Sequence, residues 1–182
     1  MREIPLGLVP GGIFRLNVQV VLGFLPCNQQ GSLPATSRKQ RMAHQFSSGV
    51  FCYNKPAWHR LGVVVDGTLP AREAFRLASA DFQVAGRPVF DADMQPIPGY
   101  QAITRMDTGR TLSVMTETYT PIQNEALIRI AEALHEDTSM DAVCVLADGK
   151  KVTFTARIRG AEGDVLPGDP VQQYLIGCTS HD

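Results

Sequence analysis

The chain has 182 residues, of which 44% are hydrophobic and 19% are charged, and its formal net charge is −1. This composition is typical of a soluble globular protein with one domain, alone or with an appendage, and it excludes a disordered chain. A net charge this small creates no strong overall field towards nucleic acid or a membrane surface.

The first 41 residues differ from the rest in charge, since they carry five basic side chains and one acidic one. Residues 42–182 carry 12 basic and 17 acidic side chains. Prolines and glycines interrupt the apolar stretch of the first segment, which is also shorter than the ~20 residues that a membrane span needs. We expect residues 1–41 to be a flexible extension from a start assigned too early, with the folded domain over 42–182. The alternative is a signal peptide, which Glu3 and Pro26 disfavour.

From Met42 onward, the first elements predicted are short. Residues 49–53 and 63–68 read as brief strands, and residues 71–80 have apolar side chains at helical spacing. Residues 82–90 then alternate between apolar and polar as a strand does.

Two hairpins and a second helix follow. Residues 100–106 and 111–119 flank a tight turn at 107–110, and residues 142–158 form a second hairpin that turns at Asp148-Gly149. Between them, Leu127, Ile130, Ala131 and Leu134 make an apolar helical stripe. A final strand begins at Val171. The order predicts an α+β fold, a largely antiparallel sheet of hairpins with two helices packed on it.

No spacing of the four cysteines or four histidines matches a metal signature, and no glycine-rich phosphate loop is present. We therefore predict no metal and no cofactor. The cysteines have no C-x-x-C pair, which favours reduced thiols and a cytoplasmic location.

The stretch KPAWHRLG contains the only tryptophan, Trp58, next to His59. In a binding role, Trp58 would stack on a base while Lys55 and Arg60 meet phosphate. In a structural role, Trp58 packs against the fold and His59 bonds a backbone carbonyl. The structural role is the more common one for a single tryptophan.

Two further segments offer polar candidates. In YTPIQN, Tyr119, Gln123 and Asn124 could contact a ligand, although Asn124 or Thr120 serving as a helix cap is the simpler interpretation. In TSHD, alternation along a strand places Ser180 and Asp182 on one face and His181 on the other. That arrangement is a poor catalytic triad, and a turn is favoured instead.

Together these segments resemble the phage/plasmid-related protein family (domain of unknown function 932). Family members begin Met-Ala-His and carry Pro-x-Trp-His-x-Leu-Gly, matched here by Pro56, Trp58, His59, Leu61 and Gly62. YTPIQN resembles a second family motif, and CTSHD resembles a third with Thr179 in place of asparagine. The resemblance covers residues 42–182. Because the family continues beyond its third motif, we expect this chain to be a truncated member, the N-terminal part of the family's α+β domain.

The resemblance implies a prokaryotic protein of phages and plasmids that assists mobile-element DNA metabolism. We therefore expect a protein that is more probably not an enzyme and that binds or anneals single-stranded DNA, with no membrane association and with oligomerisation left open. The candidate surface consists of Lys55, Trp58, His59, Arg60, Tyr119, Gln123 and Asn124. The alternatives are a hydrolase-like enzyme that uses His59 or His181 with Asp182, and a structural or host-interaction protein. Basic residues from Arg87 to Arg159 would support DNA binding if they gathered on one sheet face.

Overall fold

The computed structural model describes residues 19–21, 45–57, 59–164, 166 and 169–182, with only the backbone described for 19–21. Within these residues it contains two α-helices, one short 3₁₀ helix and strands that pair mostly antiparallel. The predicted α+β class is therefore confirmed. The tryptophan prediction lies outside the described residues, because Trp58 is not among them.

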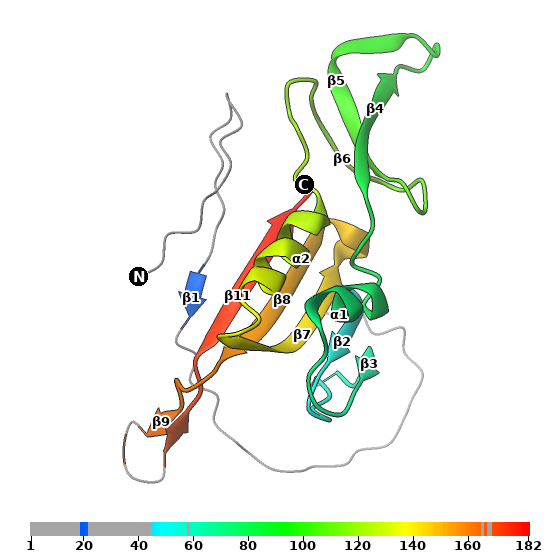
Figure 1. Cartoon of the computed structure of the whole chain (residues 1–182). Helices are drawn as coiled ribbons and strands as arrows, with labels where there is room; N and C mark the ends of the chain where they lie inside the picture. The colour runs from blue at the N-terminus through cyan, green and yellow to red at the C-terminus, as the bar shows by residue number, and fades with distance from the viewer. Residues whose placement is uncertain (1–18, 22–44, 58, 165, 167–168) are drawn as a thin grey trace.

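The main sheet has six strands in the order β1-β11-β8-β7-β2-β3 (Figure 1). The pairs are antiparallel except for β2 and β3, which run parallel. Alternation along β8 explains its place in the sheet, since Val152, Phe154 and Ala156 are buried while Thr153 and Thr155 lie on the other face. The strands are β1 (Gln19–Val21), β2 (Phe46–Phe51), β3 (Val63–Val64), β7 (Thr138–Leu146), β8 (Lys151–Ile158) and β11 (Tyr174–Ser180).

A second sheet of three strands, which we call the arm, projects from one end of the main sheet (Figure 1). It consists of β4 (Val84–Phe90), β5 (Pro96–Arg105) and β6 (Thr111–Thr116) in sequential antiparallel order. A small hairpin of β9 (Gly163–Asp164) and β10 (Pro170–Val171) lies at the opposite end. We expected one sheet of hairpins, and the hairpins are instead divided between two sheets.

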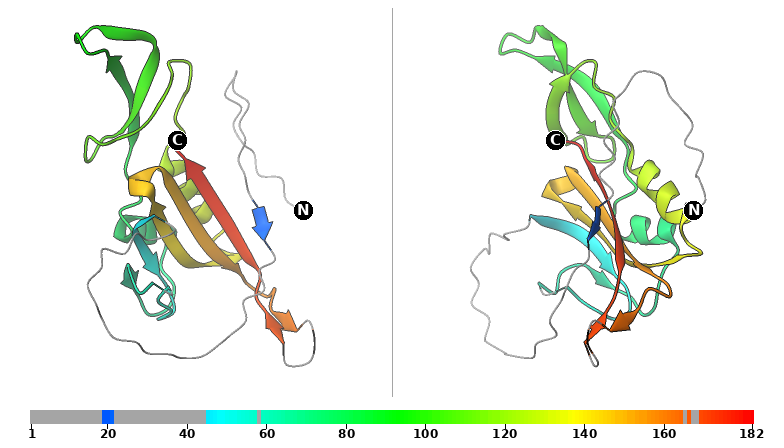
Figure 2. Two further views of the ribbon diagram at one scale, coloured as in Figure 1. Left: turned by 180° about the vertical axis from the view of Figure 1, so that it is seen from behind. Right: turned by 90° about the vertical axis from the view of Figure 1, so that its left-hand side faces the viewer.

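Both helices, α1 (Ala71–Leu77) and α2 (Asn124–Ala133), cover the same face of the main sheet (Figure 2). Phe75 of α1 and Phe154 of β8 are fully buried between these layers, with ring centroids 6.1 Å apart. The apolar side of α2 is turned slightly from the predicted stripe: Leu127, Ile128 and Ala131 are buried, whereas Ile130 is only half-buried.

The hairpin predictions are confirmed at both turns. Arg105 and Gly109 bond across the turn at 107–110, and β7 and β8 are joined by the 3₁₀ helix Ala147–Gly149. The parallel contact of β3 with β2 was not predicted. None of the helices in the described part of the chain has the length and apolar character to cross a membrane.

Candidate functional site

The predicted surface residues fall into two separate places. Lys55, His59 and Arg60 lie in the loop between β2 and β3, whereas Tyr119, Gln123 and Asn124 lie in the segment that leads from the arm into α2. The structure therefore does not bring the two groups into a single described contact cluster.

In the first place, His59 organises its own loop. Its Nδ1 accepts a hydrogen bond from the backbone N–H of Leu61 at 3.0 Å, not a contact to a carbonyl as we had expected. The ring packs on Phe46 with centroids 4.5 Å apart and meets Phe51 at 5.9 Å. Lys55 and Arg60 are exposed. The described contacts of His59 thus explain its place in the motif by packing, and they leave the two cations facing solvent.

Gly62 of the same motif is needed for its backbone conformation and its close contacts. Its φ is +93°, and a Cβ there would lie 2.7 Å from the carbonyl oxygen of Gly49 and 2.9 Å from Cε2 of Phe51. Both neighbours belong to β2, so the absence of a side chain lets the loop approach that strand and enter β3.

We expect Gly62→Ala to lower the free energy of unfolding by about 1–3 kcal/mol, through backbone strain and the clash with β2. Urea unfolding measures the effect. Gly67→Ala is the control, because Gly67 also has a positive φ (+71°) but has nothing within 4 Å of the added Cβ. Equal losses in both variants would show that the close approach to β2 contributes nothing.

In the second place, two of the motifs meet. Asn124, the first residue of α2, and His181, directly after β11, are both fully buried, and His181 Nε2 lies 3.1 Å from Asn124 Oδ1. The Nδ2 of Asn124 donates to the carbonyl of Phe82 at 3.2 Å, just before the arm begins. Side chains from α2 and the end of β11 therefore hold the segment on which the arm is mounted.

These contacts fix the tautomer of His181. Because Asn124 Nδ2 donates to a carbonyl, its Oδ1 is the atom that faces the imidazole, and His181 Nε2–H must be the donor. The other ring nitrogen, Nδ1, is buried with no hydrogen-bond partner among the described residues. Burial lowers the pKa of His181, with a smaller opposing contribution from Asp182. The ring is accordingly neutral at pH 7.

The main chain of His181 is also anchored. Its N–H donates to the carbonyl of Lys150 at 2.7 Å, in the turn between β7 and β8. Its carbonyl accepts a hydrogen bond from the hydroxyl of Ser113 on β6. His181 thus connects the arm, the β7–β8 turn and α2. We refer to this set of contacts around Asn124 and His181 as the junction.

Gln123 and Tyr119 extend the junction along the arm. The Gln123 amide accepts from the backbone N–H of Val84 at 3.0 Å and donates to its carbonyl at 2.9 Å, as a neighbouring strand would. Gln101 of β5 donates to the carbonyl of Tyr119 at 2.6 Å. The helix-cap interpretation was wrong for Asn124 and Thr120: the N-cap is Gln123, with no side-chain cap bond, because these amides have tertiary partners instead.

The TSHD segment follows the predicted alternation. Ser180 and Asp182 are exposed and their side chains bond each other, whereas His181 is buried and faces Asn124. The bond that forms is therefore side chain to side chain, not the turn contact to backbone that we expected. The hydroxyl and the imidazole have different partners, so these three residues do not form a nucleophile–base pair in this arrangement.

A groove with a volume of about 480 Å³ opens beside the junction, where three segments meet: the start of β2, the start of β6 and the β7–β8 turn. Arg110 and Asp148 form an exposed ion pair across it at 2.7 Å. Ala147 and Asp148 both have positive φ, which turns the chain sharply there. The residues that line the groove are Gln45, Phe46, Ser47, Arg110, Thr111, Leu112, Ala147, Asp148 and Lys150.

Arg105 fastens the two hairpin turns that border this groove. Its guanidinium lies 3.8 Å from the ring centre of Phe82, donates to the carbonyl of Asp148 at 3.1 Å and pairs with Asp107. The ion pair lowers the pKa of Asp107. Sequence reasoning missed the groove, although both turns carry cations, because nothing local indicates that turns 107–110 and 147–150 meet.

The remaining basic residues do not gather on one sheet face. Arg157 is held by Asp141, with Nε 2.7 Å from Oδ1, and its guanidinium stacks 4.1 Å above the ring of Tyr53. Arg87 lies on the arm, and Arg159 follows the far end of β8. The cations that do lie together are Arg110, Lys150 and the neighbouring Lys151, around the groove.

The cysteines and potential metal ligands of the described residues add no second centre. Cys52, Cys144 and Cys178 are free thiols, and burial raises the pKa of Cys144 to about 11, so its thiol is unreactive at neutral pH. No three histidine, cysteine or carboxylate side chains within the described ranges are arranged to hold a metal ion.

Comparison with known proteins identifies one family. Residues 111–182 match the family model described as Domain of unknown function (DUF932), which confirms the family that the motifs indicated. The matched stretch runs from the start of β6 through the junction residues to the end of the chain. Neither the curated proteins nor the solved structures contain a match.

Proposed function

Starting from the DUF932 match over residues 111–182, we propose that this is a non-enzymatic, cytoplasmic protein of the phage and plasmid type that binds single-stranded nucleic acid. The groove beside the junction would hold the sugar–phosphate backbone. The observation that carries the proposal is the set of three cations at the rim of this groove, Arg110, Lys150 and Lys151, which come from two different hairpins.

The charges at the groove are available to a phosphate. Among the described side chains, no carboxylate lies within ion-pair distance of Lys150 or Lys151. Arg110 does pair with Asp148, but both side chains are more than half exposed, and such a pair is weak enough to exchange for a phosphate. The hydroxyls of Ser47 and Thr111 lie in the same lining and can donate to phosphate oxygens.

The arm supplies surfaces on which bases can stack. Tyr100 of β5 is 53% exposed and Phe90 of β4 is 48% exposed. The strand register places Arg87, Tyr100 and Val114 on one face of the arm. Stacking of a base on an aromatic side chain contributes about 1–3 kcal/mol and tolerates any sequence, which suits binding without a sequence preference.

The experiment is a titration of the full chain into a fluorescent single-stranded DNA of about 30 nucleotides at about 50 and 200 mM salt. We expect binding that weakens with salt. The double variant Lys150→Ala/Lys151→Ala should bind at least about tenfold more weakly, with a salt slope reduced by about 0.7 for each lost contact. The control is Arg76→Ala/Arg129→Ala, which removes two exposed cations from the helices.

Three outcomes contradict the proposal. The first is no salt-dependent binding by the unchanged chain, and the second is an equal loss of affinity in the control variant. The third is shortening of the DNA during the titration, which would favour the hydrolase-like alternative instead.

A further inference from the structure

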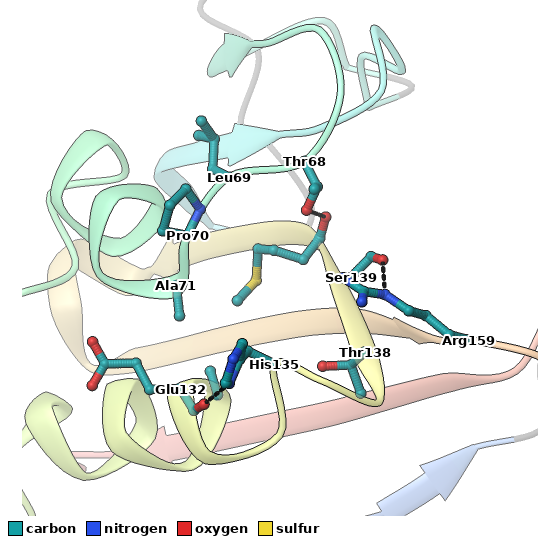
Figure 3. Close-up of a pocket in the computed structure, with 11 residues that line it drawn as sticks. Thr68, Leu69, Pro70, Ala71, Glu132, His135, Thr138, Ser139 and Arg159 are labelled. Atoms are coloured by element: carbon teal, nitrogen blue, oxygen red, sulfur yellow. Dashed lines mark hydrogen bonds between the residues drawn. The ribbon is translucent and has the colours of Figure 1, made fainter.

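A second cavity, with a volume of about 440 Å³, lies at the other end of β7 from the nucleic-acid groove (Figure 3). It opens between the start of α1, the end of α2 and the first residues of β7. Its volume is within the range of small-molecule sites. Leu69, Pro70, Ala71, Ala131 and Met140 provide an apolar surface that can accept the body of a ligand.

The carbonyl groups around this cavity are already satisfied, so they do not repel an anion. The Glu132 carbonyl accepts from Nδ1 of His135 at 2.8 Å, and the Leu134 carbonyl accepts from the Thr138 hydroxyl at 2.8 Å. The carbonyl of Met140 accepts from the hydroxyl of Thr68 at 3.1 Å. The end of α2 and the start of β7 thus retain little free acceptor capacity on this side.

The only carboxylate in the described lining is also neutralised. Glu132 is held by Arg72 of α1 through two bonds of 3.0 and 3.2 Å, and Figure 3 shows its side chain directed towards α1. Its charge is therefore balanced by a cation that does not line the cavity.

The polar groups that remain are donors. Nε of Arg159 donates to the hydroxyl oxygen of Ser139 at 3.0 Å, so the hydrogen of that hydroxyl is left to donate elsewhere (Figure 3). Nη1 of Arg159 donates to the carbonyl of Glu136 at 3.3 Å, which holds the guanidinium in place. Its Nη2 has no partner within the described ranges, and no described carboxylate pairs with Arg159.

We propose that this cavity binds a small carboxylate with an apolar body. One carboxylate oxygen accepts from Nη2 of Arg159 and the other from the hydroxyl of Ser139, while the apolar body covers Met140, Ala131 and Ala71. Charge-assisted hydrogen bonds of this kind are roughly twice as strong as neutral ones, so the anion is preferred over a neutral molecule of the same shape. The proposal is independent of nucleic-acid binding, because the two cavities share no lining residue.

The probe is phenylacetate, titrated into the full chain and followed by the backbone amide signals in ¹H–¹⁵N spectra. We expect saturable shifts at residues 68–71 and 138–140, with at least fivefold weaker binding of the neutral isostere phenylacetamide. Arg159→Gln should weaken phenylacetate at least fivefold and abolish the preference over the amide. Arg129→Gln, on the exposed side of α2, should change neither.

Ser139→Ala is the second variant, because it keeps the guanidinium and removes one donor; it should weaken phenylacetate at least threefold without unfolding the chain. No saturable shifts up to about 20 mM phenylacetate would overturn the proposal, since even millimolar binding would be seen. Equal affinity for acid and amide would also overturn it, as would unchanged binding in both the Arg159 and Ser139 variants.

Discussion

Replacing Asn124 by alanine is expected to lower the free energy of unfolding by about 2–4 kcal/mol. The substitution leaves the carbonyl of Phe82 and the Nε2–H of His181 without partners in a buried site, and an unsatisfied buried group costs about 1–3 kcal/mol. Some of this cost is relieved where water reaches the cavity that the amide leaves.

Urea unfolding of the variant and of the unchanged chain provides the measurement. The control is Gln83→Ala, because Gln83 is an exposed amide in the neighbouring segment whose main chain is the part that bonds to Met106. We expect less than about 0.5 kcal/mol from this surface change. A loss below about 1 kcal/mol for Asn124→Ala would contradict the assignment of the junction as a structural anchor.

Asn124→Ala should also loosen the arm more than the main sheet. Hydrogen exchange reports this selectively, because the arm strands β4 to β6 depend on the junction while β7 and β8 have their own long ladder. Faster exchange in residues 84–90 and 111–116, with little change in 151–158, is the expected pattern. Uniform acceleration throughout the chain would mean that the arm has no separate anchor at Asn124.

The stability of the chain is expected to fall as the pH is lowered from about 7.5 to about 5. Burial holds the folded-state pKa of His181 below its unfolded value of about 6.5. Below that unfolded value, the unfolded state binds a proton that the folded state resists, so the free energy of unfolding decreases with falling pH. The loss begins near pH 6.5 and is complete once the pH is below the folded pKa.

This pH window separates His181 from the carboxylates. Asp107 and Glu125 have folded pKa values lowered by Arg105 and Arg72, so the stability that they contribute is lost only at more acidic pH, below their unfolded values near 4. His181→Gln should flatten the profile between about pH 5 and 7, since the amide does not titrate there. His135→Gln, at an exposed position, should leave the slope unchanged. A flat profile in the unchanged chain would refute the burial argument.

The parts of the fold that the sequence predicted are those decided by local patterns. Asp148-Gly149 and the stretch 107–110 specify tight turns, and the alternation in β8 specifies which side chains face the helices. The opposite orientations of Ser180 and His181 likewise follow from the two-residue period of a strand. In each case the information lies within a few neighbouring residues.

The junction could not be predicted because its bonds join residues far apart in the sequence. Asn124 and His181 are 57 positions apart, and neither residue indicates the other. Local propensity favoured Asn124 as a helix cap, but the buried partners Phe82 and His181 determine its actual contacts. The nucleic-acid role of Lys55, His59, Arg60, Tyr119, Gln123 and Asn124 stays a prediction, as does the role of Trp58.

A double-mutant cycle between Asn124 and His181 tests the junction most directly. Unfolding free energies are measured for the unchanged chain, Asn124→Ala, His181→Ala and the double variant. Because each substitution alone strands the partner's hydrogen-bonding group, the double variant should lose less stability than the two single losses added together, with a coupling of about 1–3 kcal/mol. Strictly additive losses would mean that the two motifs do not hold each other, and the account of how the arm is mounted would be wrong.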